Sequence, residues 1–193
     1  MSIVKIKHRD FEIIEEVNEN TFIANFKNKQ YVLTKFEPKT HEADLLTYSF
    51  KRIDSSPIRS PRLLFTDKKA GYVVREKIDV ENMADYLAEK DLPENLLDQL
   101  FKNAYFARMA VMTIDYSPLS WGVKDDELFY MGDNFIPYCK EKDLIDKYIR
   151  LWFNTRELAE FLKNNGRFYD KTRIKDEYLV NKEIVLMACK YYR

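Results

Sequence analysis

The sequence has few of the residues that build metal and disulfide sites. It contains two cysteines, Cys139 and Cys189, and two histidines, His8 and His41. These side chains lie in separate segments without the spacing of a zinc site, so we expect free thiols in a reducing cytoplasm. With only four glycines, the chain also has no glycine-rich loop whose backbone N–H groups could approach a phosphate closely.

Long apolar runs and an excess of one charge are also missing. No stretch approaches the ~20 apolar residues of a membrane span, and the first ten residues contain no run long enough for a signal peptide. Lysine and arginine together number 32, as do aspartate and glutamate. This balance argues against a main role in coating nucleic acid or an anionic membrane. Hydrophobic residues make up 46% of the chain, enough for the core of one compact unit with two small lobes.

Alternating apolar patterns predict a β-rich first part of the chain. Three segments rich in aromatic and β-branched residues predict strands, and a later pair predicts an antiparallel hairpin. Between them, a helix over about residues 40–53 carries Leu45, Leu46 and Ser49 on one face. We therefore expect a five-stranded antiparallel sheet with one helix, its strands at residues 11–17, 21–27, 30–36, 60–66 and 71–78.

The second part of the chain has mainly helical patterns. A long helix with an apolar face is expected over residues 94–112, running directly toward Asp115. After Asp133 we expect only helices, and Thr155 is a predicted N-cap. These helices are expected over residues 141–153, 155–164 and 174–191.

Two aspartates, Asp115 and Asp133, each follow a strongly apolar stretch. Between them, Lys124-Asp125-Asp126-Glu127 predicts a hairpin turn that joins strands at 120–124 and 127–131. This hairpin would bring both carboxylates to one end of a small sheet. One carboxylate that orients a hydroxyl, beside another that holds Mg²⁺, is the central pair of phosphoryl transfer.

These segments resemble motifs of the protein kinase-like superfamily. Residues 113–123 resemble its catalytic loop, with Asp115 at the catalytic aspartate, and Gly132-Asp133-Asn134-Phe135 resembles its metal-binding segment. Val32-Leu33-Thr34-Lys35 resembles the strand that bears the nucleotide lysine. The resemblance implies a bilobal α+β kinase-like fold, with a β-rich lobe over residues 1–78 and a helical lobe over 79–193.

The resemblance also implies roles for individual residues. Asp115 would orient the acceptor hydroxyl and Asp133 would bind Mg²⁺, with Ser120 as a weak second metal ligand. Lys35 would hold the phosphates of ATP, with Glu42 as its anchor. Two residues of the implied hinge between the lobes would contact the nucleotide: Glu76 and Ile78.

Three functions remain open at this point. The first is a minimal, atypical kinase that transfers the ATP γ-phosphate to an unidentified hydroxyl acceptor. The second is a pseudokinase that acts through a protein partner, because Thr113, Ser120 and Asn134 depart from the family motifs and no glycine lies in the first hairpin. The third is an unrelated α+β interaction module in which both aspartates are ordinary turn residues.

Overall fold

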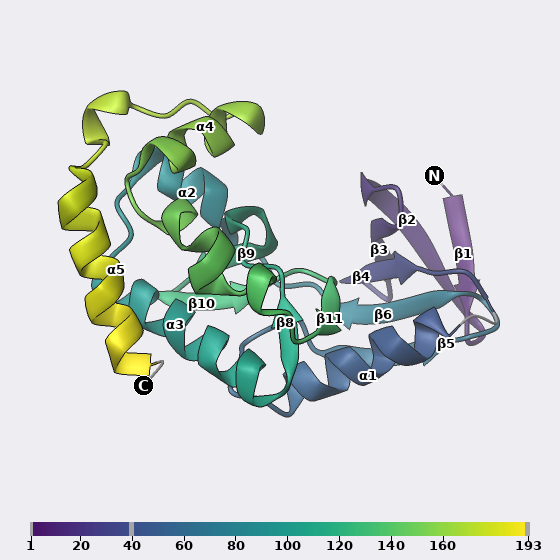
Figure 1. The fold of residues 1–193 in the computed structure, drawn as a ribbon. Helices are drawn as coiled ribbons and strands as arrows, with labels where there is room; N and C mark the ends of the chain where they lie inside the picture. The colour runs from purple at the N-terminus through teal and green to yellow at the C-terminus, as the bar shows by residue number, and fades with distance from the viewer. Residues whose placement is uncertain (1, 39–40, 192–193) are drawn as a thin grey trace. The chain divides into compact units, whose positions relative to one another are not determined.

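The computed structural model describes residues 2–38 and 41–191, which form two compact units (Figure 1). The first unit contains residues up to Ser56 together with Ser60–Asp79, and the second contains Pro57–Arg59 and the chain from Val80 onward. Both units mix helices with antiparallel sheet, so the chain is α+β.

The first unit is one six-stranded sheet with one helix. The strand order is β1-β2-β3-β4-β6-β5, and all neighbouring strands are antiparallel. The helix α1 (Glu42–Asp54) packs against β5 and β6. The strands are β1 (Ser2–Ile6), β2 (Arg9–Asn18), β3 (Thr21–Phe26), β4 (Lys29–Lys35), β5 (Leu63–Asp67) and β6 (Tyr72–Glu76).

The prediction of five strands was wrong by one strand. β1 pairs with β2 through a tight turn at Lys7 and His8, whose φ angles are +46° and +63°. Lysine is not a usual signal for positive φ, and the Lys7-His8 pair lacks the Asn-Gly or Asp-Gly pattern that marks a two-residue hairpin, so the turn was not predicted from the sequence. The turn at Lys27 and Asn28 also has positive φ, as expected for asparagine.

The strands of the first unit are held together by a cluster of buried apolar side chains. Ile6, Phe11, Ala24, Leu33 and Val74 form its core, and each is 1% exposed or less. In β6 the buried residues Val73, Val74 and Arg75 are consecutive, so side chains on both faces of this strand are covered.

The described residues of the second unit, which end at residue 191, form two small sheets and four α-helices. The three-stranded sheet has the order β10-β9-β7, and β11 pairs with β8 in the other. The strands are β7 (Glu81–Asn82), β8 (Met112–Ile114), β9 (Trp121–Lys124), β10 (Glu127–Tyr130) and β11 (Phe135–Pro137). The helices are α2 (Met83–Glu89), α3 (Glu94–Met109), α4 (Arg156–Asn164) and α5 (Glu177–Tyr191). None of the helices that the structure describes is long and apolar enough to cross a membrane.

Two of the helices predicted for this unit differ in the structure. The helix predicted over 94–112 ends at Met109, because Val111 takes a φ of +52° and the chain then enters β8. Residues 141–153 do not form one helix. They form short turns, including a π-helical turn at Leu144–Tyr148 and a 3₁₀ turn at Ile149–Trp152.

Side-chain hydrogen bonds to the backbone accompany these short turns. Asp143 accepts a 2.7 Å hydrogen bond from the N–H of Leu144 at the start of the π-helical turn. At the other end, the indole of Trp152 donates to the carbonyl of Tyr116 at 2.8 Å. The predicted N-cap Thr155 is confirmed, since its hydroxyl accepts from the N–H of Leu158 at 3.1 Å.

The C-terminal helix α5 lies along α3 within the second unit (Figure 1). Asp98 of α3 forms ion pairs with Lys102 at 2.7 Å and with Lys190 of α5 at 2.5 Å. The Tyr191 hydroxyl also donates to Asp98. This one carboxylate therefore links the two helices.

Candidate functional site

The segments that carry Asp115 and Asp133 lie side by side in the second unit. Strand β8 ends at Ile114, which pairs with Phe135 at the start of β11. Asp115 follows β8 and Asn134 precedes β11, so both lie at the same end of this two-stranded sheet. Asp133 is the residue before Asn134. The predicted hairpin also forms, as β9 and β10. The expectation of only helices after Asp133 was wrong, because β11 is the strand that joins the two segments.

The hydroxyl of Tyr130 bridges the two segments. It accepts a hydrogen bond from the backbone N–H of Asp115 at 3.3 Å and donates to the carbonyl of Asn134 at 3.1 Å. Tyr130 is fully buried. A Cβ on Gly132 would lie 2.6 Å from the Tyr130 hydroxyl oxygen, so the chain needs glycine here to pass the ring. The sequence analysis missed the role of Tyr130.

The carboxylate of Asp115 is held at both oxygens. Oδ1 accepts from the N–H of Ser117 at 2.9 Å, and Oδ2 accepts from the hydroxyl of Ser120 at 2.7 Å. The indole N–H of Trp121 donates to the Asp115 carbonyl at 2.9 Å. A carboxylate has about four acceptor positions, so Asp115 is oriented and can still accept a hydrogen bond from a ligand hydroxyl.

Asp133 is the residue that the kinase-like resemblance implies as a magnesium ligand. It is half-buried, and it forms no ion pair with any residue in the described part of the chain. Mg²⁺ in nucleotide sites is bound by one or two carboxylates together with the substrate phosphates. The described residues contain no cluster of three or more acidic, cysteine or histidine side chains that could hold a metal. The role of Asp133 as a magnesium ligand stays a prediction.

Ser120 lies in this site, but its hydroxyl points at Asp115. The implied role of Ser120 was a weak second metal ligand. Its hydrogen bond to Oδ2 of Asp115 instead favours a role in orienting that carboxylate.

A pocket of about 170 Å³ opens beside Asp115 in the second unit. Thr113 and Ile114 of β8 line the pocket, together with Asn134 and Ile136 from the segment that contains β11. The remaining wall consists of Lys142, Lys147 and Tyr148. The sequence analysis did not single out these two lysines.

The other residues implied for nucleotide binding belong to the first unit. Lys35 is the last residue of β4, its side chain is exposed, and its N–H donates to the carbonyl of Asn20 at 2.7 Å. Glu76 ends β6 and is exposed, and Ile78 is half-buried in the segment that follows. Glu42 is the first residue of α1, and its side chain lies outside the described part of the structure. The roles of these four residues stay predictions.

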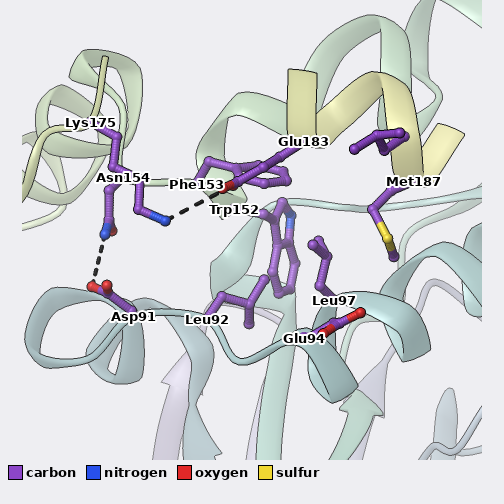
Figure 2. Close-up of a pocket in the computed structure, with 11 residues that line it drawn as sticks. Asp91, Leu92, Glu94, Leu97, Trp152, Phe153, Asn154, Lys175, Glu183 and Met187 are labelled. Atoms are coloured by element: carbon purple, nitrogen blue, oxygen red, sulfur yellow. Dashed lines mark hydrogen bonds and ion pairs between the residues drawn. The ribbon is translucent and has the colours of Figure 1, made fainter. Parts of the chain in front are cut away.

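A larger cavity of about 380 Å³ lies elsewhere in the second unit (Figure 2). Its floor includes Trp152 and Leu97. Two polar contacts lie in its lining: the amide of Asn154 donates to Asp91 at 2.8 Å, and the ammonium of Lys175 lies 3.9 Å from a carboxylate oxygen of Glu183. Of these two pockets, the smaller one is lined by Asp115, so it is the candidate functional site.

Of the three comparisons with known proteins, one finds a structure with a similar fold. Neither the scan of protein-family models nor the search of curated proteins finds a match for this sequence. Among solved structures, the chain is similar to WbdD, whose structure was determined with the kinase inhibitor LY294002, at a TM-score of 0.58 and 13% sequence identity. The match covers 97% of this chain and 48% of the WbdD chain, so this chain spans about half the length of that protein.

Proposed function

We propose that this protein is a minimal kinase that transfers the γ-phosphate of ATP to a hydroxyl acceptor and requires Mg²⁺. The observation that carries the proposal is the pairing of β8 with β11, which sets the oriented carboxylate of Asp115 beside the segment of Asp133. The similarity of the fold to a protein that was crystallised with a kinase inhibitor supports it.

Each residue then has a defined task. Asp115 accepts a hydrogen bond from the acceptor hydroxyl and aims its oxygen at the γ-phosphorus. Asp133 binds the Mg²⁺ that neutralises the ATP phosphates. Lys35 binds phosphate, with Glu42 as its anchor, and Glu76 and Ile78 contact the nucleotide. The hydroxyl proton of the acceptor passes to Asp115, and a new bond forms between the acceptor oxygen and the γ-phosphorus. The bond between the γ-phosphorus and the β–γ bridging oxygen breaks, and ADP leaves.

The experiment that tests this proposal measures binding and turnover separately. Binding of ATP is measured by calorimetry with and without Mg²⁺, and slow ATP turnover is measured by release of ADP. Asp133→Ala is expected to abolish Mg²⁺-dependent binding. Asp115→Asn is expected to leave binding intact and to lower turnover by about 10²–10⁴-fold, the range of a positioned acid–base group. Glu160→Ala, an exposed acid on α4, is the control.

The same experiment distinguishes the scaffold alternative. If the wild-type protein neither binds nor turns over ATP, and Asp133→Ala folds and behaves like wild type in every assay, then the kinase proposal fails. A pseudokinase or another partner-binding role would then be favoured. If ATP binds in a Mg²⁺-dependent manner without turnover, the protein is a nucleotide-binding pseudokinase.

A further inference from the structure

We infer that the pocket beside Asp115 binds an anionic group of the acceptor, a phosphate or a carboxylate, through Lys142 and Lys147. The inference rests on the proposed function, because that function assigns Asp115 to the acceptor hydroxyl. It adds the substrate class: a small hydroxyl compound that carries negative charge.

The two lysines reach the pocket from two neighbouring turns. Lys142 ends the 3₁₀ turn Lys140–Lys142, and Lys147 lies in the π-helical turn Leu144–Tyr148. The ammonium of Lys147 lies 4.8 Å from the centre of the Tyr148 ring, which lines the same pocket. A cation over an aromatic face is attracted to it, so this contact favours positions of the exposed Lys147 ammonium close to Tyr148.

The nearby acids do not neutralise these lysines. Within residues 2–38 and 41–191, neither lysine forms an ion pair. Glu141 accepts from the thiol of Cys139 at 3.2 Å, and Asp143 is buried and accepts from the Tyr138 hydroxyl at 3.1 Å. Neither of these acids, nor Asp146, lines the pocket. The pocket therefore contains two positive charges and one negative charge.

The single negative charge, on Asp115, is already held by Ser117 and Ser120. A ligand with only negative groups would be repelled by it. A ligand with both a hydroxyl and an anionic group satisfies the whole pocket, because the hydroxyl donates to Asp115 while the anion meets the two ammonium groups. The exposed amide of Asn134 and the hydroxyl of Tyr148 supply further hydrogen-bond donors on the lining.

The size of the pocket agrees with this assignment. Its volume of about 170 Å³ is smaller than the usual range for a drug-sized ligand, which begins near 300 Å³. It holds a small anionic head with its neighbouring hydroxyl more readily than a whole nucleotide.

The test uses three small hydroxyl compounds that carry a phosphate, a carboxylate or no charge: glycerol 3-phosphate, glycerate and glycerol. Each is titrated without nucleotide into the ¹⁵N-labelled full chain, and the backbone N–H signals of residues 113–115 and 142–148 are followed by NMR. We expect saturable shifts with millimolar affinity for glycerol 3-phosphate or glycerate, and none for glycerol at the same concentration. Comparing the two anions distinguishes a phosphate from a carboxylate ligand.

Matched variants assign the effect to the two lysines. Lys142→Ala/Lys147→Ala is expected to weaken anion binding about tenfold or more, the loss of two charge-assisted contacts. Lys142→Arg/Lys147→Arg keeps the charge and should retain binding. The control Lys140→Ala/Lys182→Ala removes the same charge from exposed lysines that do not line the pocket. The backbone N–H signals of this control variant also show whether the loss of two lysine charges alone changes the fold.

Three results would overturn the inference. The first is no saturable shift of the wild type at about 50 mM of either anion, well above a millimolar dissociation constant. The second is equal binding by the wild type and the double alanine variant, or equal weakening by the control. The third is a loss of Mg²⁺–ATP binding in Lys142→Ala/Lys147→Ala that matches its loss of anion binding, since the lysines would then serve the nucleotide.

Failure of the kinase proposal gives a different pattern. If the wild type binds glycerol 3-phosphate in a lysine-dependent manner but does not bind Mg²⁺–ATP, the anion site stands and the phosphotransferase function falls. If Mg²⁺–ATP binds and neither anion does, the kinase proposal stands and the acceptor class inferred above is wrong.

Discussion

The hydroxyl of Ser120 donates a 2.7 Å hydrogen bond to Oδ2 of Asp115. Ser120 closes the 3₁₀ turn Pro118–Ser120 and directly precedes β9, so the turn and the strand together fix where its hydroxyl points. The other carboxylate oxygen is fixed by the N–H of Ser117. The aspartate therefore has one defined orientation within its own unit.

Removing this hydroxyl is expected to affect turnover more than nucleotide binding. Ser120→Ala frees Oδ2 of Asp115, and we expect kcat to fall about tenfold, equivalent to the ~1.4 kcal/mol of one hydrogen bond to a charged group. Ser120→Thr keeps the hydroxyl and should recover most of the activity. Calorimetry should find the same Kd for Mg²⁺–ATP in all three proteins. A large rise in that Kd for Ser120→Ala would instead support the role of Ser120 as a metal ligand.

Tyr130 provides a second test of how the site is held together. Tyr130→Phe leaves the ring in place but removes the two hydrogen bonds that the Tyr130 hydroxyl makes, one to the segment of Asp115 and one to the segment of Asp133. Because the Tyr130 hydroxyl is buried, we expect the free energy of unfolding to fall by about 1–3 kcal/mol. Urea denaturation measures this loss. Tyr105→Phe, on the exposed face of α3, is the control and should change stability little. A neutral Tyr130→Phe would show that the bridge does not hold the segments together.

Asp98 predicts a pH dependence of stability. Partial burial acts to raise the pKa of Asp98. Hydrogen bonds from Lys102, Lys190 and Tyr191 outweigh this effect and hold the pKa of Asp98 well below its usual range. A carboxyl with a lowered pKa in the folded state stabilises the protein above its unfolded pKa of about 3.9, and this contribution is lost as the pH falls below that value.

The matching variant is Asp98→Asn. At pH 7 we expect it to lower the free energy of unfolding by about 1–2 kcal/mol, because α5 loses its charged link to α3. Denaturation curves at several pH values should show this difference shrinking as the pH falls below about 4. Glu160→Gln serves as the control. A difference that stays constant with pH would contradict an electrostatic origin.

Asp143 predicts a pH dependence of stability with the opposite sign to that of Asp98. Its burial raises its pKa, and the negative charge of Asp146 adds to this, while the N–H of Leu144, the hydroxyl of Tyr138 and the charge of Arg108 act against it. A carboxyl with a raised pKa costs stability as the pH rises from its unfolded pKa of about 3.9 through the folded value.

Asp143→Asn removes this titration while its amide oxygen can still accept from the N–H of Leu144. We expect the stability of the variant, relative to wild type, to increase as the pH rises through that window. Urea denaturation of both proteins over this pH range measures the difference. If the two stabilities change in parallel, the carboxyl of Asp143 does not titrate differently in the folded protein.

The local elements of this fold could be predicted from the residues themselves. Strands β2 to β6, the helix α1, the β9–β10 hairpin and the Thr155 cap each depend on a periodic pattern or a turn signal within a short stretch. The segments of the two aspartates could be proposed in the same way, because apolar stretches precede each of them. The kinase-like resemblance depends on the motifs at residues 32–35, 113–123 and 132–135 taken together with the order of these elements.

What the sequence analysis missed depends on contacts between distant residues. The pairing of Ile114 with Phe135, the bridge made by Tyr130 and the position of Lys142 and Lys147 beside Asp115 have no short-range signature. The three residues of β11 are too few to show the alternating pattern of a strand. A tyrosine or lysine near Asp115 also cannot be distinguished, from the sequence alone, from one elsewhere on the protein. The sequence by itself determined which stretches become strands and helices, through burial and backbone preference. Only the tertiary structure decided which side chains surround Asp115, because that depends on which stretches pack together.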